Sequence, residues 1–323
     1  MNLIGMQIKK SKILVIGFGT VGQGFYELFH SKRKALGLED VSISEIVDMK
    51  YGHIIDPDEN ILDELKGGRT YPKIEPVQAI KNSDANIMCE FTWLDLKNAE
   101  PAFTHIRTAL ALGKNVITTN KGPSALKFKE LNNLAVENGV KFLMKGTVMA
   151  GTPSYNILKL LPGIEVKSVR GIMNGTTNFI LGSMEEGNTF EDALKKAQQL
   201  GYAEADPSND VDGFDAAAKI IIISNLLGWN HEFNKIEVKG IRDINREQAK
   251  QKTKLIAYAD KNVAYVKPMK LSNDDILANV NGVMNAIEFE TDTLGKIYSM
   301  GPGAGRIQTA QAAMTDLLSL LRK

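Results

Sequence analysis

Lys12-Ile-Leu-Val-Ile-Gly-Phe-Gly-Thr-Val-Gly22 is the stretch that determines the fold class of this chain. The apolar run before the first glycine is typical of a buried strand, and the pattern from Val21 to about Leu36 is typical of a helix. Glycines at the turn permit close backbone approach to a pyrophosphate, and the helix N-terminus favours negative charge. The stretch therefore predicts a dinucleotide site whose binding loop comprises Gly17, Phe18, Gly19, Thr20, Val21 and Gly22.

The end of the next predicted strand bears on which dinucleotide fits. Asp48 would accept hydrogen bonds from the ribose hydroxyls of NAD, whereas Lys50 would balance the 2′-phosphate of NADP. In the plainer interpretation, Asp48 is only a solvated residue at a strand end. Both NAD(H) and NADP(H) therefore stay open as the cofactor.

Short apolar runs alternate with helical patterns through the first 145 residues. Further strands are expected at 43–47, 85–91, 115–118 and 141–144, with helices at 98–112 and 123–138. Alternating strands and helices predict an α/β fold with an N-terminal Rossmann-type, doubly wound parallel sheet. Its ligand site would lie beyond the carboxyl ends of the strands.

The pattern changes after residue 152, where an α+β domain is expected. It would contain a strand at 166–173, a helix capped by Asn188 or Thr189, a very apolar helix at 213–227 and a hairpin near Thr293-Leu-Gly295. A last helix is expected at 309–321. We therefore predict a dinucleotide-binding domain over 1–147, a second domain over 148–304, and a C-terminal segment, 305–323, that packs back on the first.

Composition narrows the class of protein. Lys and Arg number 39 against 38 Asp and Glu, so the formal charge of +1 provides no field for a nucleic-acid partner. Cys89 is the single cysteine, which fits a reducing compartment. No signal peptide and no uncharged apolar stretch of membrane-spanning length is present. We expect a soluble, cytoplasmic protein without membrane partners.

The run Asp206-Pro-Ser-Asn-Asp-Val-Asp-Gly-Phe-Asp-Ala-Ala-Ala-Lys-Ile-Ile-Ile-Ile223 places a lysine at the start of an apolar helix. At helical spacing, Asp212, Asp215 and Lys219 share one face. In one interpretation, Lys219 lies where a polar cleft meets a core, tuned for proton exchange by burial and neighbouring carboxylates. In the other, Asp215 and Lys219 form an ordinary surface pair. Periodicity alone does not decide between them.

Three other polar or glycine-rich segments suggest ligand contacts. Asn174-Gly-Thr-Thr-Asn178 would either cap a helix or present hydroxyls and amides to a ligand. Gly201-Tyr-Ala-Glu-Ala-Asp-Pro207 places Glu204 on a loop before the lysine helix, and Gly301-Pro-Gly-Ala-Gly305 suggests backbone that approaches a ligand.

Together these segments resemble homoserine dehydrogenase. The matching pieces follow in family order: Gly17–Gly22, Thr118-Thr-Asn-Lys-Gly-Pro123, Asn174–Asn178, Gly201–Pro207, Asp210–Lys219 and Gly301–Thr309. The resemblance implies reversible NAD(P)H-dependent reduction of L-aspartate 4-semialdehyde to L-homoserine, in threonine, methionine and isoleucine synthesis. It also implies a homodimer, or higher oligomer, formed through the second domain. A regulatory ACT domain and an aspartate kinase domain are not expected.

The resemblance also implies roles for individual residues. Lys219 matches the general acid/base, Lys121 a second active-site amine, and Asp210 and Asp215 residues that hold substrate and lysine in place. Glu204 would bind the substrate ammonium, and Gly175 and Thr176 would close on the amino acid. Thr92 and Gly303 match positions that contact the nicotinamide half. Two alternatives stay open: a dehydrogenase for another small amino-acid-derived aldehyde, and a non-catalytic NAD(P)H sensor.

Lys145 departs from the family pattern. The family usually has a glutamate there, which joins backbone carbonyls matching Val148, Ala150 and Thr152 in holding a monovalent cation. An ammonium would repel a metal ion and offer three donors to the same acceptors. We therefore expect activity that is independent of sodium and potassium. The alternative is that Lys145 points into solvent and the carbonyls hold a weak ion.

Overall fold

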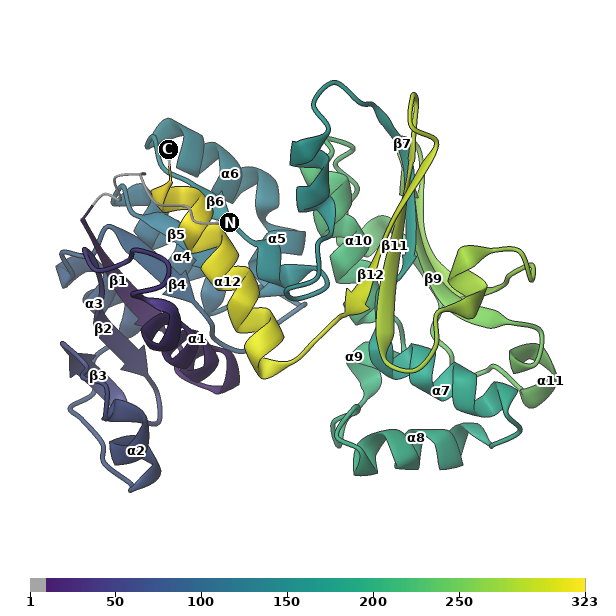
Figure 1. The fold of residues 1–323 in the computed structure, drawn as a ribbon, viewed down its shortest axis with the longest axis horizontal. Helices are drawn as coiled ribbons and strands as arrows, with labels where there is room; N and C mark the ends of the chain where they lie inside the picture. The colour runs from purple at the N-terminus through teal and green to yellow at the C-terminus, as the bar shows by residue number, and fades with distance from the viewer. Residues whose placement is uncertain (1–9, 323) are drawn as a thin grey trace. The chain divides into compact units, whose positions relative to one another are not determined.

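The computed structural model describes residues 10–322, which form two compact units. The first unit comprises the described residues up to Gly151 together with the segment that begins at Gly305, and the second spans Thr152–Ala304. Each unit is built on its own six-stranded sheet (Figure 1).

The sheet of the first unit has the strand order β3-β2-β1-β4-β5-β6. Its strands are β1 (Ser11–Ile16), β2 (Val41–Asp48), β3 (Gly52–Ile55), β4 (Ile87–Glu90), β5 (Asn115–Thr118) and β6 (Phe142–Leu143). All neighbours pair in parallel except β2 and β3, which form an antiparallel edge that the sequence did not predict. The direction of winding reverses between β1 and β4, so the sheet is a Rossmann-type doubly wound sheet with a ligand crevice at that point.

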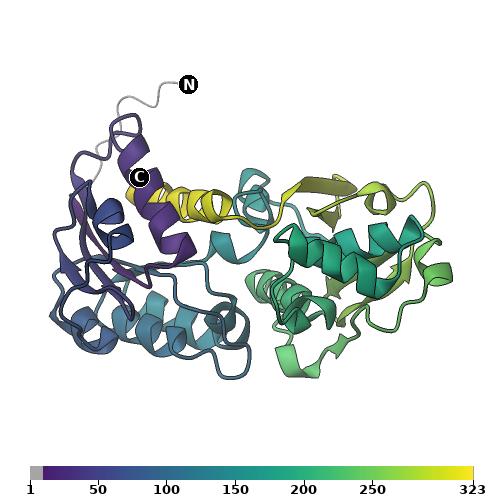
Figure 2. The ribbon, with the colours of Figure 1, turned by 90° about the horizontal axis from the view of Figure 1, so that it is seen from below.

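Helices cover both faces of this sheet. They are α1 (Thr20–Lys32), α2 (Ile61–Lys66), α3 (Pro76–Asn82), α4 (Ala102–Ala111), α5 (Lys121–Leu126), α6 (Phe128–Glu137) and α12 (Arg306–Leu321). α1 and α12 lie side by side and bury Phe25, Phe29, Met314 and Leu317 in one core (Figure 2). The single helix expected at 123–138 is in fact two, because the chain leaves helical geometry at Lys127.

The second unit is an α+β domain with the strand order β12-β11-β7-β9-β10-β8. Its strands are β7 (Val166–Ile172), β8 (Glu237–Val238), β9 (Thr253–Asp260), β10 (Ala264–Lys270), β11 (Met284–Thr291) and β12 (Lys296–Pro302). Pairing is antiparallel except between β8 and β10. The hairpin expected near Thr293 connects β11 to β12, and Gly295 adopts the positive φ of +65° that its turn requires.

The helices of the second unit are α7 (Gly175–Glu185), α8 (Phe190–Gln199), α9 (Ser208–Val211), α10 (Phe214–Leu226) and α11 (Arg246–Ala249). Asn174 caps α7 and Thr189 caps α8 through their side chains, as N-terminal capping predicts. Residues 215–224 of α10 are all buried, which agrees with its apolar sequence. Among the described residues, no helix is long and apolar enough to cross a bilayer.

Candidate active site

Two of the three glycines of the loop in the first unit, Gly17 and Gly22, have no room for a side chain. A Cβ on Gly17, whose φ is +88°, would lie 2.7 Å from the carbonyl carbon of Phe91. A Cβ on Gly22 would lie 2.4 Å from the Gly17 oxygen. No side chain caps the N-terminus of α1, where Gly19 leaves open space. This end of the helix therefore fits the pyrophosphate of a dinucleotide.

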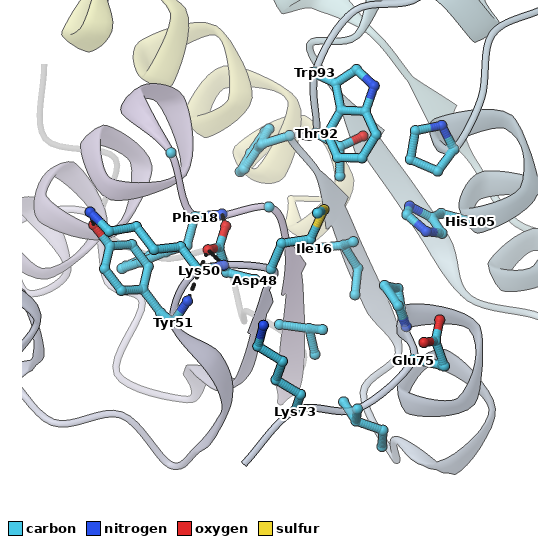
Figure 3. A pocket seen from close by; sticks show the side chains of 18 of the residues that line it. Ile16, Phe18, Asp48, Lys50, Tyr51, Lys73, Glu75, Thr92, Trp93 and His105 are labelled. Atoms are coloured by element: carbon cyan, nitrogen blue, oxygen red, sulfur yellow. Dashed lines mark hydrogen bonds between the residues drawn. The ribbon is translucent and has the colours of Figure 1, made fainter. Parts of the chain in front are cut away.

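A cavity of about 1300 Å³ opens at the carboxyl ends of β1, β2 and β4 (Figure 3). Its lining includes the predicted cofactor residues Gly17, Phe18, Gly19, Thr20, Asp48, Lys50 and Thr92. Of the other two residues of the predicted loop, Val21 is half-buried and Gly22 is buried, and both lie within the first turn of α1. The cavity therefore lies at the crevice that the strand order predicts.

Asp48 ties two loops together. Its Oδ2 accepts a hydrogen bond from Phe18 N at 2.8 Å, and its Oδ1 accepts bonds from Lys50 N at 2.8 Å and Tyr51 N at 3.2 Å (Figure 3). The interpretation of Asp48 as merely solvated is therefore wrong. The carboxylate lines the cavity and also shapes it, because it fixes the backbone of both loops.

Two exposed lysines also line the cavity. Lys50 Nζ lies 4.8 Å from the centre of the Tyr51 ring and 3.3 Å from its hydroxyl. Lys73, from the loop between α2 and α3, is the second. A 2′-phosphate is the cofactor group that such exposed cations attract.

Lys219 is buried in the second unit, with 6% of its surface exposed. Its Nζ donates to Asp215 Oδ2 at 2.7 Å and to the Met173 carbonyl at 2.6 Å. The interpretation of Asp215 and Lys219 as a surface pair is wrong, because the pair forms inside the unit. The amine thus lies where the end of β7 meets the start of α10.

Asn174 connects this pair to further site residues. Its Nδ2 donates to Asp215 Oδ2 at 2.9 Å and to Asp210 Oδ1 at 2.6 Å, while its Oδ1 accepts from Thr177 N. The side chain therefore both caps α7 and binds the two carboxylates. Lys219, Asp215, Asn174 and Asp210, which we call the lysine cluster, form one connected polar group.

Gly175 and Thr176, the first residues of α7, are held by their neighbours. A Cβ on Gly175 would lie 2.5 Å from the Val283 oxygen, and Thr176 Oγ1 donates to the Tyr202 carbonyl at 2.6 Å. The loop that the sequence expects to close on an amino acid is therefore fixed directly beside the lysine cluster.

Asp212 does not join the lysine cluster, which corrects the expected shared face. Gly213 has a φ of +88° and separates α9 from α10, so the helical phase is not continuous across it. Asp212 instead forms an ion pair with Arg242 at 2.5 Å. Glu204 lies exposed on the turn after α8, where its carbonyl accepts from Gln198.

Several polar residues with site geometry were missed by the sequence analysis. Glu90, at the end of β4, is fully buried, and Asn120 is buried beside Lys121. Asn285 is fully buried under Gly303, whose Cβ would lie 2.2 Å from its side chain, and neither polar atom finds a hydrogen-bond partner in the described structure. Each lies in a run that is otherwise typical of a buried strand or a turn. A buried polar residue within such a run was the one available signal.

Lys145 is 3% exposed and therefore does not point into solvent. Its Nζ donates to the Ala150 carbonyl at 2.7 Å, and its backbone N donates to Asp316 Oδ2 at 2.8 Å. In the turn that the bond to Ala150 closes, Met149 has a φ of 55° and Ala150 a φ of 45°. Burial lowers the pKa of Lys145 to about 8, and Asp316 partly offsets this change. An ammonium thus braces a strained turn.

The Rossmann-type sheet, glycine loop and cavity, with a second α+β unit, define an NAD(P)-dependent oxidoreductase. The chain belongs to the homoserine dehydrogenase family. The family model described as homoserine dehydrogenase matches residues 153–318. A homoserine dehydrogenase from Sulfurisphaera tokodaii is 44% identical over 96% of this chain and 99% of its own.

Two further relatives differ in the cofactor that they name. An NAD(+)-dependent homoserine dehydrogenase from Pseudomonas canavaninivorans is 35% identical, over 96% of each chain. A hyperthermophilic archaeal homoserine dehydrogenase, solved in complex with NADPH, has a TM-score of 0.84 at 32% identity, covering 97% of this chain and 98% of its own. Both cofactors therefore occur among relatives of full length.

Proposed function

We propose that this protein is a homoserine dehydrogenase that interconverts L-homoserine and L-aspartate 4-semialdehyde with NAD(P)(H). The observation that carries this proposal is the buried lysine cluster, because a conserved fold alone would not supply a positioned proton donor. The nicotinamide cofactor, when bound, supplies the hydride chemistry.

Lys219 is the general acid/base of the proposed reaction. In the reducing direction its ammonium donates a proton to the oxygen that develops negative charge, and in the oxidising direction the amine accepts it. Asp215 and the Met173 carbonyl fix the Nζ position, and Asn174 fixes Asp215. A donor held in this way is typically worth about 10²- to 10⁴-fold in rate.

The remaining site residues bind and orient. Lys121, the first residue of α5, supplies a second amine, and Asp210 is held by Asn174 for contact with the substrate. Gly175 and Thr176 enclose the amino acid, and the exposed carboxylate of Glu204 binds its ammonium. Thr92 and Gly303 contact the nicotinamide half.

Lys145 replaces the monovalent cation that the resemblance implies. The residues present do not fit such an ion, because a buried ammonium donates to the Ala150 carbonyl that the ion would need. The ammonium therefore orders the turn without an ion, and the carbonyls of Val148 and Thr152 are not ion ligands here.

The proposal includes a homodimer that is formed through the second unit. Large apolar side chains lie exposed on its sheet: Val263 (50%) in the turn between β9 and β10, Leu294 (53%) in the turn between β11 and β12, and Met300 (59%) within β12. Burial of these side chains against a second copy would remove their apolar surface from water. Sedimentation equilibrium of the whole chain tests the dimer.

Homoserine oxidation followed at 340 nm, with NAD and NADP in parallel, tests the activity. Saturable homoserine-dependent reduction of either cofactor supports the proposal. Turnover of another amino-alcohol, without turnover of homoserine, would identify the protein as a related dehydrogenase with a different substrate. Cofactor binding without turnover of any of them would leave a non-catalytic sensor.

A further inference from the structure

A buried polar network ties the carboxyl ends of β4 and β5 together. Glu90 is the last residue of β4 and is fully buried. Its Oε1 accepts bonds from Thr92 N at 3.1 Å and from the Thr92 hydroxyl, and its Oε2 accepts from Thr118 Oγ1 at 3.2 Å. One carboxylate therefore holds the residues at both strand ends.

Asn120 forms the second half of this network. Its backbone N donates to Thr118 Oγ1 at 3.0 Å, and its Nδ2 donates to the carbonyls of Trp93 at 2.8 Å and Thr92 at 3.2 Å. Its Oδ1 accepts from Gly122 N and caps α5. Because α5 begins with Lys121, the backbone of that lysine is fixed relative to Thr92.

The loops after β1, β4 and β5 are tightly packed against one another at two glycines. A Cβ on Gly122 would lie 2.4 Å from the Asp95 oxygen, and a Cβ on Gly17 would lie 2.8 Å from Thr92 N. The glycine loop and the two strand-end loops are therefore packed in direct contact. The Glu90 carboxylate is thus bonded directly to backbone that lines the cavity.

His105 on α4 places an imidazole ring beside the same carboxylate. It is 4% exposed, and its Nδ1 lies 3.7 Å from Glu90 Oε1. Figure 3 shows His105, Thr92 and Trp93 at the same end of the cavity. A buried carboxylate is costly even when hydrogen-bonded, so a role beyond packing would account for its position.

We propose that Glu90 is a positioning residue for the nicotinamide end of the cavity: together with Asn120, it sets the placement of Thr92 and Lys121. Glu90 has no surface to offer a ligand, so it acts through these two residues. Its effect on turnover rests on the proposed function, whereas its effect on dinucleotide binding does not.

The test compares two ligands that differ in the nicotinamide ring alone. These are the reduced cofactor that the wild type uses, and ADP-ribose or its 2′-phosphate, whichever matches that cofactor. For Glu90→Gln we expect the affinity for the reduced cofactor to fall about fivefold or more, with ADP-ribose binding unchanged within about twofold. Asn120→Ala should also lower the affinity for the reduced cofactor and leave ADP-ribose binding unchanged. In both variants kcat for homoserine oxidation should fall.

Glu45→Gln is the matched control. Glu45 is a largely buried carboxylate of the same sheet that contacts His53 at 2.8 Å and Ser83, away from the cavity. It should weaken neither ligand. The inference is overturned if Glu90→Gln behaves like this control, or if both ligands weaken in parallel, as general loss of structure would produce. A wild type that binds cofactor but does not oxidise homoserine would refute the function, and the binding comparison would still decide the role of Glu90.

Discussion

Lys219 Nζ lies 2.7 Å from Asp215 Oδ2, one helical turn earlier, and both side chains are buried. Burying an ion pair costs about as much free energy as the attraction returns, so such a pair is weak evidence for stability. Here the carboxylate is shared with Asn174, and the ammonium is shared with the Met173 carbonyl. The arrangement fixes the amine at one point, as proton transfer requires.

Lys219→Ala should lower kcat at least about a hundredfold and leave cofactor affinity nearly unchanged, because the amine serves proton transfer. Steady-state kinetics and cofactor titration measure the two quantities. Since the change leaves Asp215 buried without its partner, the urea midpoint should also fall. Added ethylamine should restore part of kcat in this variant and should not raise kcat of the wild type. Near-normal turnover without amine would remove Lys219 from the mechanism.

Cofactor preference should depend on Lys50 more than on Asp48. Because Asp48 accepts bonds from Phe18 and Lys50 backbone groups, Asp48→Ala should weaken NAD and NADP alike, rather than NAD alone. Lys50→Ala should lower the ratio of kcat/KM for NADP over NAD about tenfold, the effect of one lost charge-assisted contact. Lys81→Ala, an exposed lysine of α3 outside the cavity lining, is the control. An unchanged ratio in Lys50→Ala would mean that it does not contact the ribose phosphate.

The sequence predicted the parallel strands, the capped helices and the lysine helix, because each has a local pattern of glycine, capping residue or apolar spacing. It could not predict that Gly213 breaks the helical phase, since a glycine is equally compatible with a helix start. It also missed Glu90, which ends an apolar strand and has one of its two partners, Thr118, on a strand 28 residues later. The local sequence pattern does not reveal contacts between residues that are far apart in the chain.

His30 should make stability depend on pH. Burial is the main cause that lowers its pKa below the ordinary 6.5, Arg33 adds to the shift, and its Nε2 finds no hydrogen-bond partner in the described structure. The unfolded chain therefore binds more protons than the native one just below pH 6.5, so stability is full above that pH and falls on acidification. His30→Phe retains an aromatic ring beside Tyr26, where the two ring centres now lie 4.3 Å apart, and should reduce the loss of stability on acidification. Urea midpoints at pH 7.5 and 5.5 measure it, and parallel curves for both proteins would contradict the prediction.

Native Cys89 should resist thiol reagents. It is fully buried in β4, and burial raises the pKa of its thiol, so little reactive thiolate forms. Ellman's reagent at pH 8 should label it only after denaturation. Rapid labelling of the folded protein would show that β4 opens to solvent.

Lys145 should make the enzyme independent of sodium and potassium. Its ammonium already donates to the Ala150 carbonyl at 2.7 Å, so an added ion would find a positive charge beside the oxygens that it needs. At constant ionic strength, exchanging N-methylglucamine for either ion should change kcat/KM and the thermal midpoint by no more than weak screening does. Strong, saturable activation by sodium or potassium would refute the substitution of ammonium for ion.

Two variants separate the charge of Lys145 from its packing. Lys145→Met should lose stability and activity, because the Ala150 carbonyl is left buried without its donor. Lys145→Glu should lose stability in N-methylglucamine and recover it saturably with sodium or potassium, because a carboxylate beside carbonyls recreates an ion site. Lys114→Glu is the matched control: it removes a buried ammonium that donates to the Ser83 and Ala85 carbonyls at 2.7 Å, in the same unit. Ion-dependent recovery of stability in Lys145→Glu alone would locate an ion site at the 145–150 turn. Equal recovery in Lys114→Glu would show that the ions only screen charge, and would contradict the prediction.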